Sequence, residues 1–192
     1  MVTSVGGTEG LPYPTGLSVG GAYGAEQVWN ENDPADGLVA ATGGAPSLLF
    51  PVPAFQAGLG LSSRTVPDIS YNAAISGGVL VYWSALGGDA AGFYIVGGTS
   101  AGAPQWAAIV ALANQYGAAH GHGPLGNINS ALYTLAESSA YANDFHDITV
   151  GNNMLGGVLP GFSAGTGYDF ASGWGTPNVA NLIPDLVNTV FP

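Results

Sequence analysis

Residues 94–115 carry the pattern that most limits the fold of this chain. The segment YIVGGTSAGAPQWAAIVALANQ passes from a short apolar run through two glycines to apolar residues at helical spacing. It predicts a buried strand, a tight turn, and a helix over residues 100–116 whose apolar positions at helical spacing are Trp106, Ile109, Val110 and Ala113. Pro104 is expected in the first turn of that helix and Gly117 at its end. A strand that leads directly into a helix is typical of α/β proteins, so α/β is the predicted fold class.

The other segments give weaker signals. Residues 2–8 predict a short strand, residues 79–85 and 92–96 predict a hairpin, and residues 9–66 read as mostly irregular. Residues 127–138 contain a short helix capped by Asn127 or Asn129. A last helix is expected after Thr176 and Pro177, with a kink or break at Pro184. A chain of 192 residues that is 47% hydrophobic is long enough for one domain with its own core.

The balance of charges is unusual. Arg64 is the single Lys or Arg against twelve Asp and Glu, which gives a formal net charge of −11. Such a chain cannot neutralise phosphates, so binding to nucleic acid is excluded. A protein with one cation also has few carboxylate–cation pairs to lose in acid, which favours an acidic extracellular environment. An ordinary acidic protein is the alternative, because 7% charged residues are too few for a halophilic surface.

Targeting and cysteine signals are absent from the sequence. No apolar run of about 18 residues lacks glycine, proline or polar breaks, so we expect no membrane span. The first residues, MVTSVGGTEG, have neither the basic nor the apolar region of an export signal, so a secreted protein would not carry its signal in this chain. Zero cysteines exclude disulfides, thiol nucleophiles and thiolate metal sites.

Ser100 is the candidate nucleophile. A hydroxyl between a strand and a helix is exposed at the end of the sheet, and the helix dipole favours negative charge beside it. The ordinary alternative is that Ser100 or its neighbour only caps the helix. Residues 98–102 also satisfy the G-x-S-x-G pattern of α/β-hydrolases, which needs a histidine downstream. His120, His122 and His146 are the candidates, although all three lie in loop-like sequence.

A family resemblance covers nearly the whole chain. GGTSAGAPQWAAIVALANQ is similar to the nucleophile segment of the sedolisins, the serine-carboxyl peptidases. MVTSVGGT, EQVWN and RTVPDIS before it, and FHDITVGNN and AGTGYDFASGWGTPN after it, follow the family's order. The resemblance implies a subtilisin-like parallel-sheet sandwich with helices, of which residues 1–192 are the C-terminal part of the catalytic domain. It also implies an acid-acting endopeptidase in which Ser100, within the turn 97–104, forms an acyl-enzyme.

Two loops contain the oxygens that a calcium ion needs. Asp147 and Asp169 offer carboxylates, while Ile148, Gly165 and Gly167 offer backbone carbonyls. Aspartates next to glycines more often only cap turns, and spacing alone favours that alternative. The resemblance to the sedolisins implies instead one Ca²⁺ held by these five residues, in loops 147–148 and 165–169.

The acids that would activate Ser100 are not found. In the sedolisins a glutamate acts as the base, an aspartate four residues later orients it, and another aspartate donates to the oxyanion; the resemblance places all three before residue 1. None of the glutamates of this chain has an acid four residues later, and these are Glu9, Glu26, Glu31 and Glu137. The chain alone is therefore expected to be inactive. A non-catalytic calcium-binding module of the same fold and an α/β-hydrolase-type esterase are the alternatives.

The expected partners follow from these inferences. The substrate would be a peptide or protein, and neither nucleic acid nor a membrane is expected. A parallel sheet that is only partly present should leave an exposed edge and a half-covered core face. We therefore expect self-association or pairing with an N-terminal partner chain.

Overall fold

The computed structural model describes residues 2–11, 23–33, 38–85, 87–156 and 159–192. The elements of the N-terminal half are β1 (Val5–Leu11), β2 (Ala25–Val28), β3 (Asn30–Asp33), β4 (Leu38–Ala41), β5 (Ala45–Pro51), the 3₁₀ helix η1 (Ala54–Leu59), β6 (Ser63–Val66) and β7 (Ile69–Asn72). Those of the C-terminal half are β8 (Val79–Trp83), η2 (Gly88–Ala90), β9 (Gly92–Val96), α1 (Thr99–Ala119), α2 (Asn129–Ala136), α3 (Tyr141–Asp144), β10 (Phe145–His146), β11 (Thr176–Pro177) and α4 (Val179–Val190).

The central sheet has the order β2-β1-β7. Strands β1 and β7 are parallel, with Val5 opposite Ile69, whereas β2 runs antiparallel to β1. The other described strands form two-stranded antiparallel pairs. The expectation that residues 9–66 are mostly irregular was wrong, because β2 to β6 lie there. Four of these strands have only four residues each, and the longer β5 contains two prolines, so their partners rather than their sequence periodicity decide their structure.

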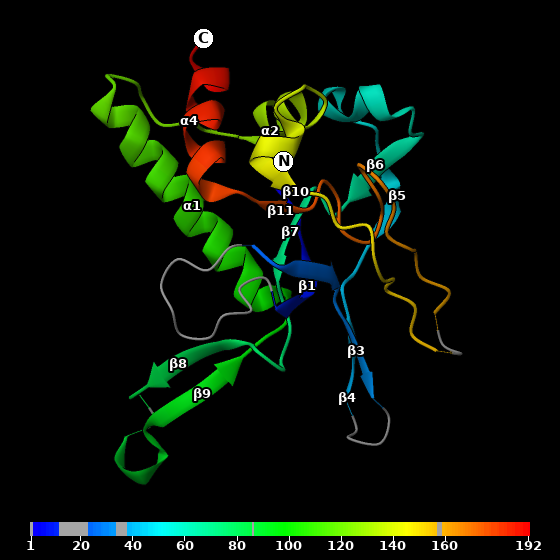
Figure 1. The fold of residues 1–192 in the computed structure, drawn as a ribbon, viewed down its shortest axis with the longest axis vertical. Helices are drawn as coiled ribbons and strands as arrows, with labels where there is room; N and C mark the ends of the chain where they lie inside the picture. The colour runs from blue at the N-terminus through cyan, green and yellow to red at the C-terminus, as the bar shows by residue number, and fades with distance from the viewer. Residues whose placement is uncertain (1, 12–22, 34–37, 86, 157–158) are drawn as a thin grey trace.

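Helix α1 packs against the parallel pair and runs beside α4 (Figure 1). Gly102 permits the close approach, because a Cβ there would lie 3.2 Å from the Tyr71 Cβ. The Trp106 indole N–H donates to the backbone oxygen of Ser70 at 3.0 Å. The predicted helix is confirmed and slightly longer than expected, since it begins at Thr99 and ends at Ala119.

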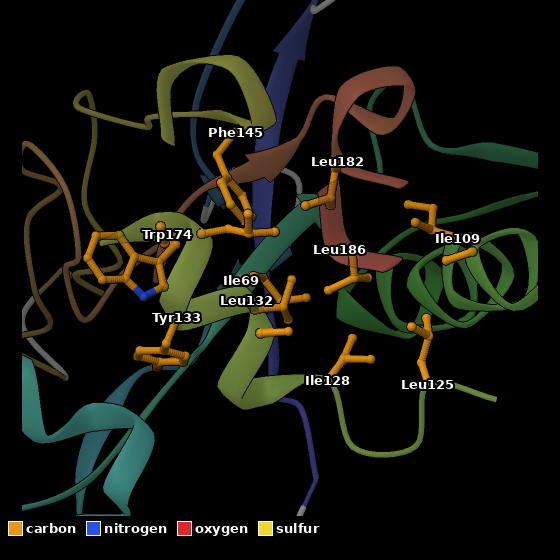
Figure 2. Close-up of a cluster of buried hydrophobic side chains, with 14 of the residues drawn as sticks. Ile69, Ile109, Leu125, Ile128, Leu132, Tyr133, Phe145, Trp174, Leu182 and Leu186 are labelled. Carbon is orange, nitrogen blue, oxygen red and sulfur yellow. The ribbon is translucent and has the colours of Figure 1, made fainter. Parts of the chain in front are cut away.

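One large core lies between the parallel strands and the helices. Figure 2 shows Leu132 of α2 and Leu182 and Leu186 of α4 gathered around Ile69, and all four side chains are fully buried. Complete burial of such a side chain contributes roughly 1.5–3 kcal/mol. The core therefore fixes α2 and α4 on the same layer of the molecule as α1.

The helix boundaries differ in part from the sequence prediction. Helix α2 has Ile128 at its N-cap position, and Asn127 contributes instead by accepting the N–H of Asn129 at 3.1 Å. Helix α4 continues through Pro184, which removes only one helical hydrogen bond in a well-packed helix. The expected break is therefore not observed.

The predicted hairpin is confirmed as β8 and β9, paired from Val79–Val96 to Trp83–Gly92. It projects from the body at the lower left of Figure 1 and leads into α1. Its large side chains are exposed on both faces: Leu80 is 62% exposed on one face, and Trp83 is 48% exposed on the other. An apolar hairpin with both faces exposed is unusual for a protein that acts alone.

The only Lys or Arg of the chain serves a buried carboxylate. Arg64 donates to both oxygens of Asp68, at 2.8 and 2.5 Å, and Asp68 is fully buried. Asp68 also accepts the Tyr133 hydroxyl at 2.8 Å and the Ser4 N–H at 2.7 Å. Burial acts to lower the pKa of Arg64, but the hydrogen bond and the charge of Asp68 outweigh it and raise that pKa. This network ties the residue before β1, strand β6 and helix α2 to the segment before β7.

Within the described residues, no helix combines the length and the apolar character needed to cross a membrane.

Candidate active site

Ser100 lies in the first turn of α1, and its side chain is exposed. The chain reaches it from β9 through Gly97 and Gly98. Gly98 has φ 75°, which strains any residue with a Cβ, and a Cβ at Gly97 would lie 2.8 Å from the Ala74 carbonyl oxygen. Both glycines are therefore needed to place Ser100 where it is.

The start of α1 places the positive end of the helix dipole beside this hydroxyl, and of its first-turn N–H groups that of Ala101 donates to the Gly98 oxygen at 2.9 Å. The N–H groups of a first helical turn have no intrahelical acceptor, and they carry the positive end of the helix dipole. Pro104 was expected in the first turn, but the helix begins at Thr99, so Pro104 is its sixth residue and lies just beyond that turn. The Ser100 hydroxyl makes no side-chain hydrogen bond within the described residues. An exposed hydroxyl at the positive end of a helix can act as a nucleophile near an oxyanion.

Two of the candidate histidines lie at the opposite end of α1. His120 is the C-cap residue, and its Nδ1 is 2.8 Å from the Tyr116 oxygen. The ring of His122 stacks on Phe191 with centroids 4.8 Å apart. At about 1.5 Å per residue the helix separates this end from Ser100 by roughly 30 Å. Neither histidine can act as the base for Ser100.

His146 lines a polar pocket to which Ser100 does not contribute. It stacks on Tyr23 at 3.6 Å and lines a cavity of about 320 Å³ with Glu26 and Gln105 among its other residues. Burial lowers the pKa of His146, while the charge of Glu26 opposes this. No hydrogen bond joins His146 to Ser100 in the described part of the chain, so the triad of an α/β-hydrolase is not formed there.

Glu31 is the carboxylate connected to the serine turn. It accepts the Trp29 indole N–H at 2.8 Å and the N–H groups of Ile75 and Ser76 at 2.7 Å each. The Trp29 ring is 3.9 Å from the position of a Cβ on Gly98. Burial acts to raise the pKa of Glu31, but these three hydrogen bonds lower it on balance. Glu31 is thus held ionised as a structural acceptor.

The remaining glutamates are also placed away from the hydroxyl. Glu9 accepts from Gln27, and Glu26 accepts from Thr8 and Thr176. Glu137 is exposed beside Gly58. Among the described residues, no acid or histidine is hydrogen-bonded to Ser100, so its activating groups are not found in this part of the chain.

The two predicted calcium loops lie together. Asp147 follows β10, and the N–H of Gly167 donates to its Oδ2 at 3.0 Å. Asp169 closes the second loop by accepting the N–H of Gly165 at 2.9 Å. Gly175 permits this arrangement, because a Cβ there would lie 2.1 Å from the backbone oxygen of the residue before Asp147. Residues 20 apart in the sequence thus face one another.

The oxygens of these loops fit a calcium ion. Asp147 Oδ1 is buried and lacks a hydrogen-bond partner within the described residues. The carbonyl oxygens of Ile148, Gly165 and Gly167 accept no hydrogen bond from any described donor. The Asp169 oxygens accept hydrogen bonds from N–H groups of their own loop, as in a capped turn. One donor to Asp169 Oδ2 is the Ser172 hydroxyl, which can rotate away to admit a cation. The side chains of this site supply two carboxylates. The described residues contain no cluster of three or more acids or histidines that could hold a metal ion.

Comparison with known proteins identifies the family. No family model matches the chain. It is 33% identical over 183 residues to sedolisin of Pseudomonas sp. (strain 101), a match that covers 94% of this chain and 28% of that protein. It is 37% identical over 172 residues to kumamolisin of Bacillus sp. (strain MN-32), covering 84% of this chain and 28% of that protein. The chain belongs to the sedolisin family.

Relatives and a solved structure extend this family assignment. Human tripeptidyl-peptidase 1 is 30% identical over 196 residues, covering 92% of this chain and 32% of that protein. The structure of Pseudomonas sedolisin, a serine-carboxyl proteinase complexed with two molecules of pseudo-iodotyrostatin, superposes with a TM-score of 0.76 at 32% identity. That match covers 95% of this chain and 45% of the solved chain, and it confirms the α/β fold. This sedolisin-family chain thus spans less than a third of the length of each of these curated relatives.

Proposed function

We propose that this chain is the nucleophile-bearing, C-terminal part of an acid-acting serine-carboxyl endopeptidase. The observation that carries the proposal is the exposed Ser100 hydroxyl in the first turn of α1, positioned by Gly97 and Gly98 in a chain of the sedolisin family. The substrate is a peptide or protein. The surroundings are acidic and extracellular, which agrees with the net charge of −11.

The proposed chemistry divides between this chain and the rest of the catalytic domain. Ser100 Oγ attacks the scissile carbonyl carbon, its proton passes to a carboxylate base, and the N–H groups of the first turn of α1 lie beside the developing charge. The C–N bond then breaks, the amine takes up the proton, and water releases the acyl group. The base must come from residues outside the described part of the chain. A carboxylate suits this role in acid, where a histidine would already be charged.

Peptide hydrolysis by the protein and by its Ser100→Ala variant tests the function. The protein, supplied with the remainder of its catalytic domain, should cleave peptides near pH 4, and the variant should not. Activity that survives the substitution contradicts the proposal. Calcium binding without any activity would favour the alternative of a non-catalytic module.

We also propose that Asp147, Asp169 and the carbonyls of Ile148, Gly165 and Gly167 hold one Ca²⁺. The support is the unpartnered Asp147 Oδ1 beside three carbonyls that no described donor occupies. The ion would neutralise the two carboxylates and tie the loop after β10 to the loop before β11. This would stabilise the fold without taking part in the reaction.

Removal of the metal is expected to lower the melting temperature at pH 6. EDTA should destabilise the protein, and EDTA already saturated with calcium should not. In Asp147→Asn the two treatments should give the same melting temperature, because one charged ligand is lost. The effect should weaken near pH 3, since the ligands must be deprotonated to bind metal. Equal melting temperatures of the unmodified protein in both solutions would count against the site.

The exposed apolar surface is proposed to be covered by the N-terminal part of the catalytic domain. Besides the β8–β9 hairpin, α1 exposes Leu112 (51%), and an open hollow of about 560 Å³ lies between α1 and Val5. Separated from that part, this chain should self-associate through the same surface. Light scattering should therefore detect dimers or larger species, and Phe93→Ser together with Leu80→Ser should shift them toward monomer. A monomer at all concentrations would argue against an interface here.

A further inference from the structure

Asp144 is a buried carboxyl group without a matching donor. It is the last residue of α3, and its side chain is 0% exposed. No N–H or hydroxyl group of the described residues donates to either of its carboxyl oxygens. An ionised carboxylate in such a position is strongly unfavourable, because it loses water and gains no donor. The side chain must therefore be protonated or share a proton.

Asp185 of α4 faces this group. The two helices are fastened at this point, since the Asn178 N–H donates to the Asp144 backbone oxygen at 2.7 Å and Asn181 Nδ2 to the Asn143 oxygen at 2.9 Å. Asp185 lies one helical turn after Asn181 on the same face of α4, and its negative charge and a side-chain hydrogen bond act on the Asp144 carboxyl group. Two ionised carboxylates have only acceptors, so this bond exists only when one of them carries a proton.

The titratable groups on the neighbouring elements do not neutralise the pair. Each of them interacts with another group or is exposed. Three make ring contacts: His120 with Tyr116 at the end of α1, His122 with Phe191, and His146 with Tyr23. The hydroxyl of Tyr133 donates to Asp68, that of Tyr141 donates to the Trp174 oxygen, and Glu137 is exposed beside Gly58. Arg64, the only Lys or Arg of the chain, is bound to Asp68. The charge that acts on Asp144 is therefore that of Asp185.

We propose that Asp144 and Asp185 form an acid pair that binds one proton and so clamps α3 to α4 in acid, and that the clamp opens toward neutral pH. Burial, followed by the negative charge and the hydrogen bond of Asp185, raises the pKa of Asp144 to about 6. The ordinary value of an aspartate is about 3.9. A carboxyl pKa that is higher in the folded than in the unfolded state stabilises the fold fully below about pH 4. This stabilisation is lost as the pH rises through about 6.

The clamp connects the two halves of the helical layer. Helix α4 packs along α1, whose first turn carries Ser100, and α3 leads directly into β10. An opened pair leaves two facing carboxylates between elements that position the candidate site. The inference does not depend on peptidase activity, because the pair affects stability whether or not Ser100 reacts.

The pH dependence of unfolding tests the clamp. In the unmodified protein the unfolding equilibrium constant should rise roughly fiftyfold between pH 4 and pH 7 from this pair alone. Asp144→Asn keeps the shape and supplies an N–H donor to Asp185 at every pH, so this component should disappear. Glu137→Gln removes an exposed carboxylate outside the pair, and it should keep the original dependence. A pH dependence in Asp144→Asn equal to that of the unmodified protein overturns the clamp.

A second measurement needs no variant. The carbon-13 resonance of the Asp144 carboxyl should titrate with a midpoint near 6 in the folded protein. A midpoint near 4, about the value of an ordinary aspartate, would show that no proton is shared and would also overturn the proposal.

Discussion

Replacing Ser100 with alanine is expected to lower kcat/KM for peptide cleavage near pH 4 by a factor of at least about 10³. Loss of the nucleophile in a serine peptidase removes covalent catalysis and leaves only binding and oxyanion stabilisation, and such losses reach about 10⁶ in kcat. Steady-state cleavage of a chromogenic peptide measures the effect. The substitution removes one exposed oxygen, so the melting temperature should not change.

Two controls make this result specific. Ser139→Ala removes another exposed serine hydroxyl, far from α1 in sequence, and should leave activity unchanged. Acid quenching during turnover should also trap a peptidyl group on a fragment containing residues 94–115, and mass spectrometry should detect it in the unmodified protein only. An adduct on a different residue would reject Ser100 as the nucleophile.

Replacing Arg64 with methionine is expected to destabilise the protein by about 3–5 kcal/mol, because Asp68 then remains as a buried charge without its cation. Asp68 is fully buried, and Arg64 is the only Lys or Arg in the sequence. The side chain of methionine keeps the packing against Phe55, over which the guanidinium lies at 5.4 Å. Urea unfolding at pH 6 measures the loss.

The double variant Arg64→Met with Asp68→Asn separates charge from packing. The amide introduced by Asp68→Asn can still accept a hydrogen bond from Tyr133 or Ser4 but carries no charge, so part of the lost stability should return. A loss below about 1 kcal/mol in the single variant would instead indicate an ordinary surface ion pair.

The signals that were readable from the sequence are local. The helix after residue 98, the β8–β9 hairpin and the buried positions Trp106, Ile109 and Ala113 follow from apolar spacing over a few residues. The strands β2 to β6 were missed because their pairing, not their periodicity, makes them strands. The family assignment was also readable, because similar segments occur in the same order along the chain.

Neither the Arg64–Asp68 pair nor the Asp144–Asp185 pair was predicted, and only the first could have been recognised from the sequence. Arg64 and Asp68 are four residues apart, and the presence of a single cation could have indicated that it serves a buried acid. Asp144 and Asp185 lie far apart in the chain, on different helices, and nothing in either local sequence marks them as a pair. Their relation depends on how α3 and α4 pack.

The sequence by itself determined that Ser100 stands in a glycine turn at the start of a helix, because backbone geometry there depends on neighbouring residues. It also determined the surplus of acids. Only the tertiary structure decided which of those acids are exposed, which is paired with Arg64, and that the buried Asp144 lies against Asp185. Those outcomes depend on contacts between residues far apart in the chain, where burial and charge act through space and leave no local pattern.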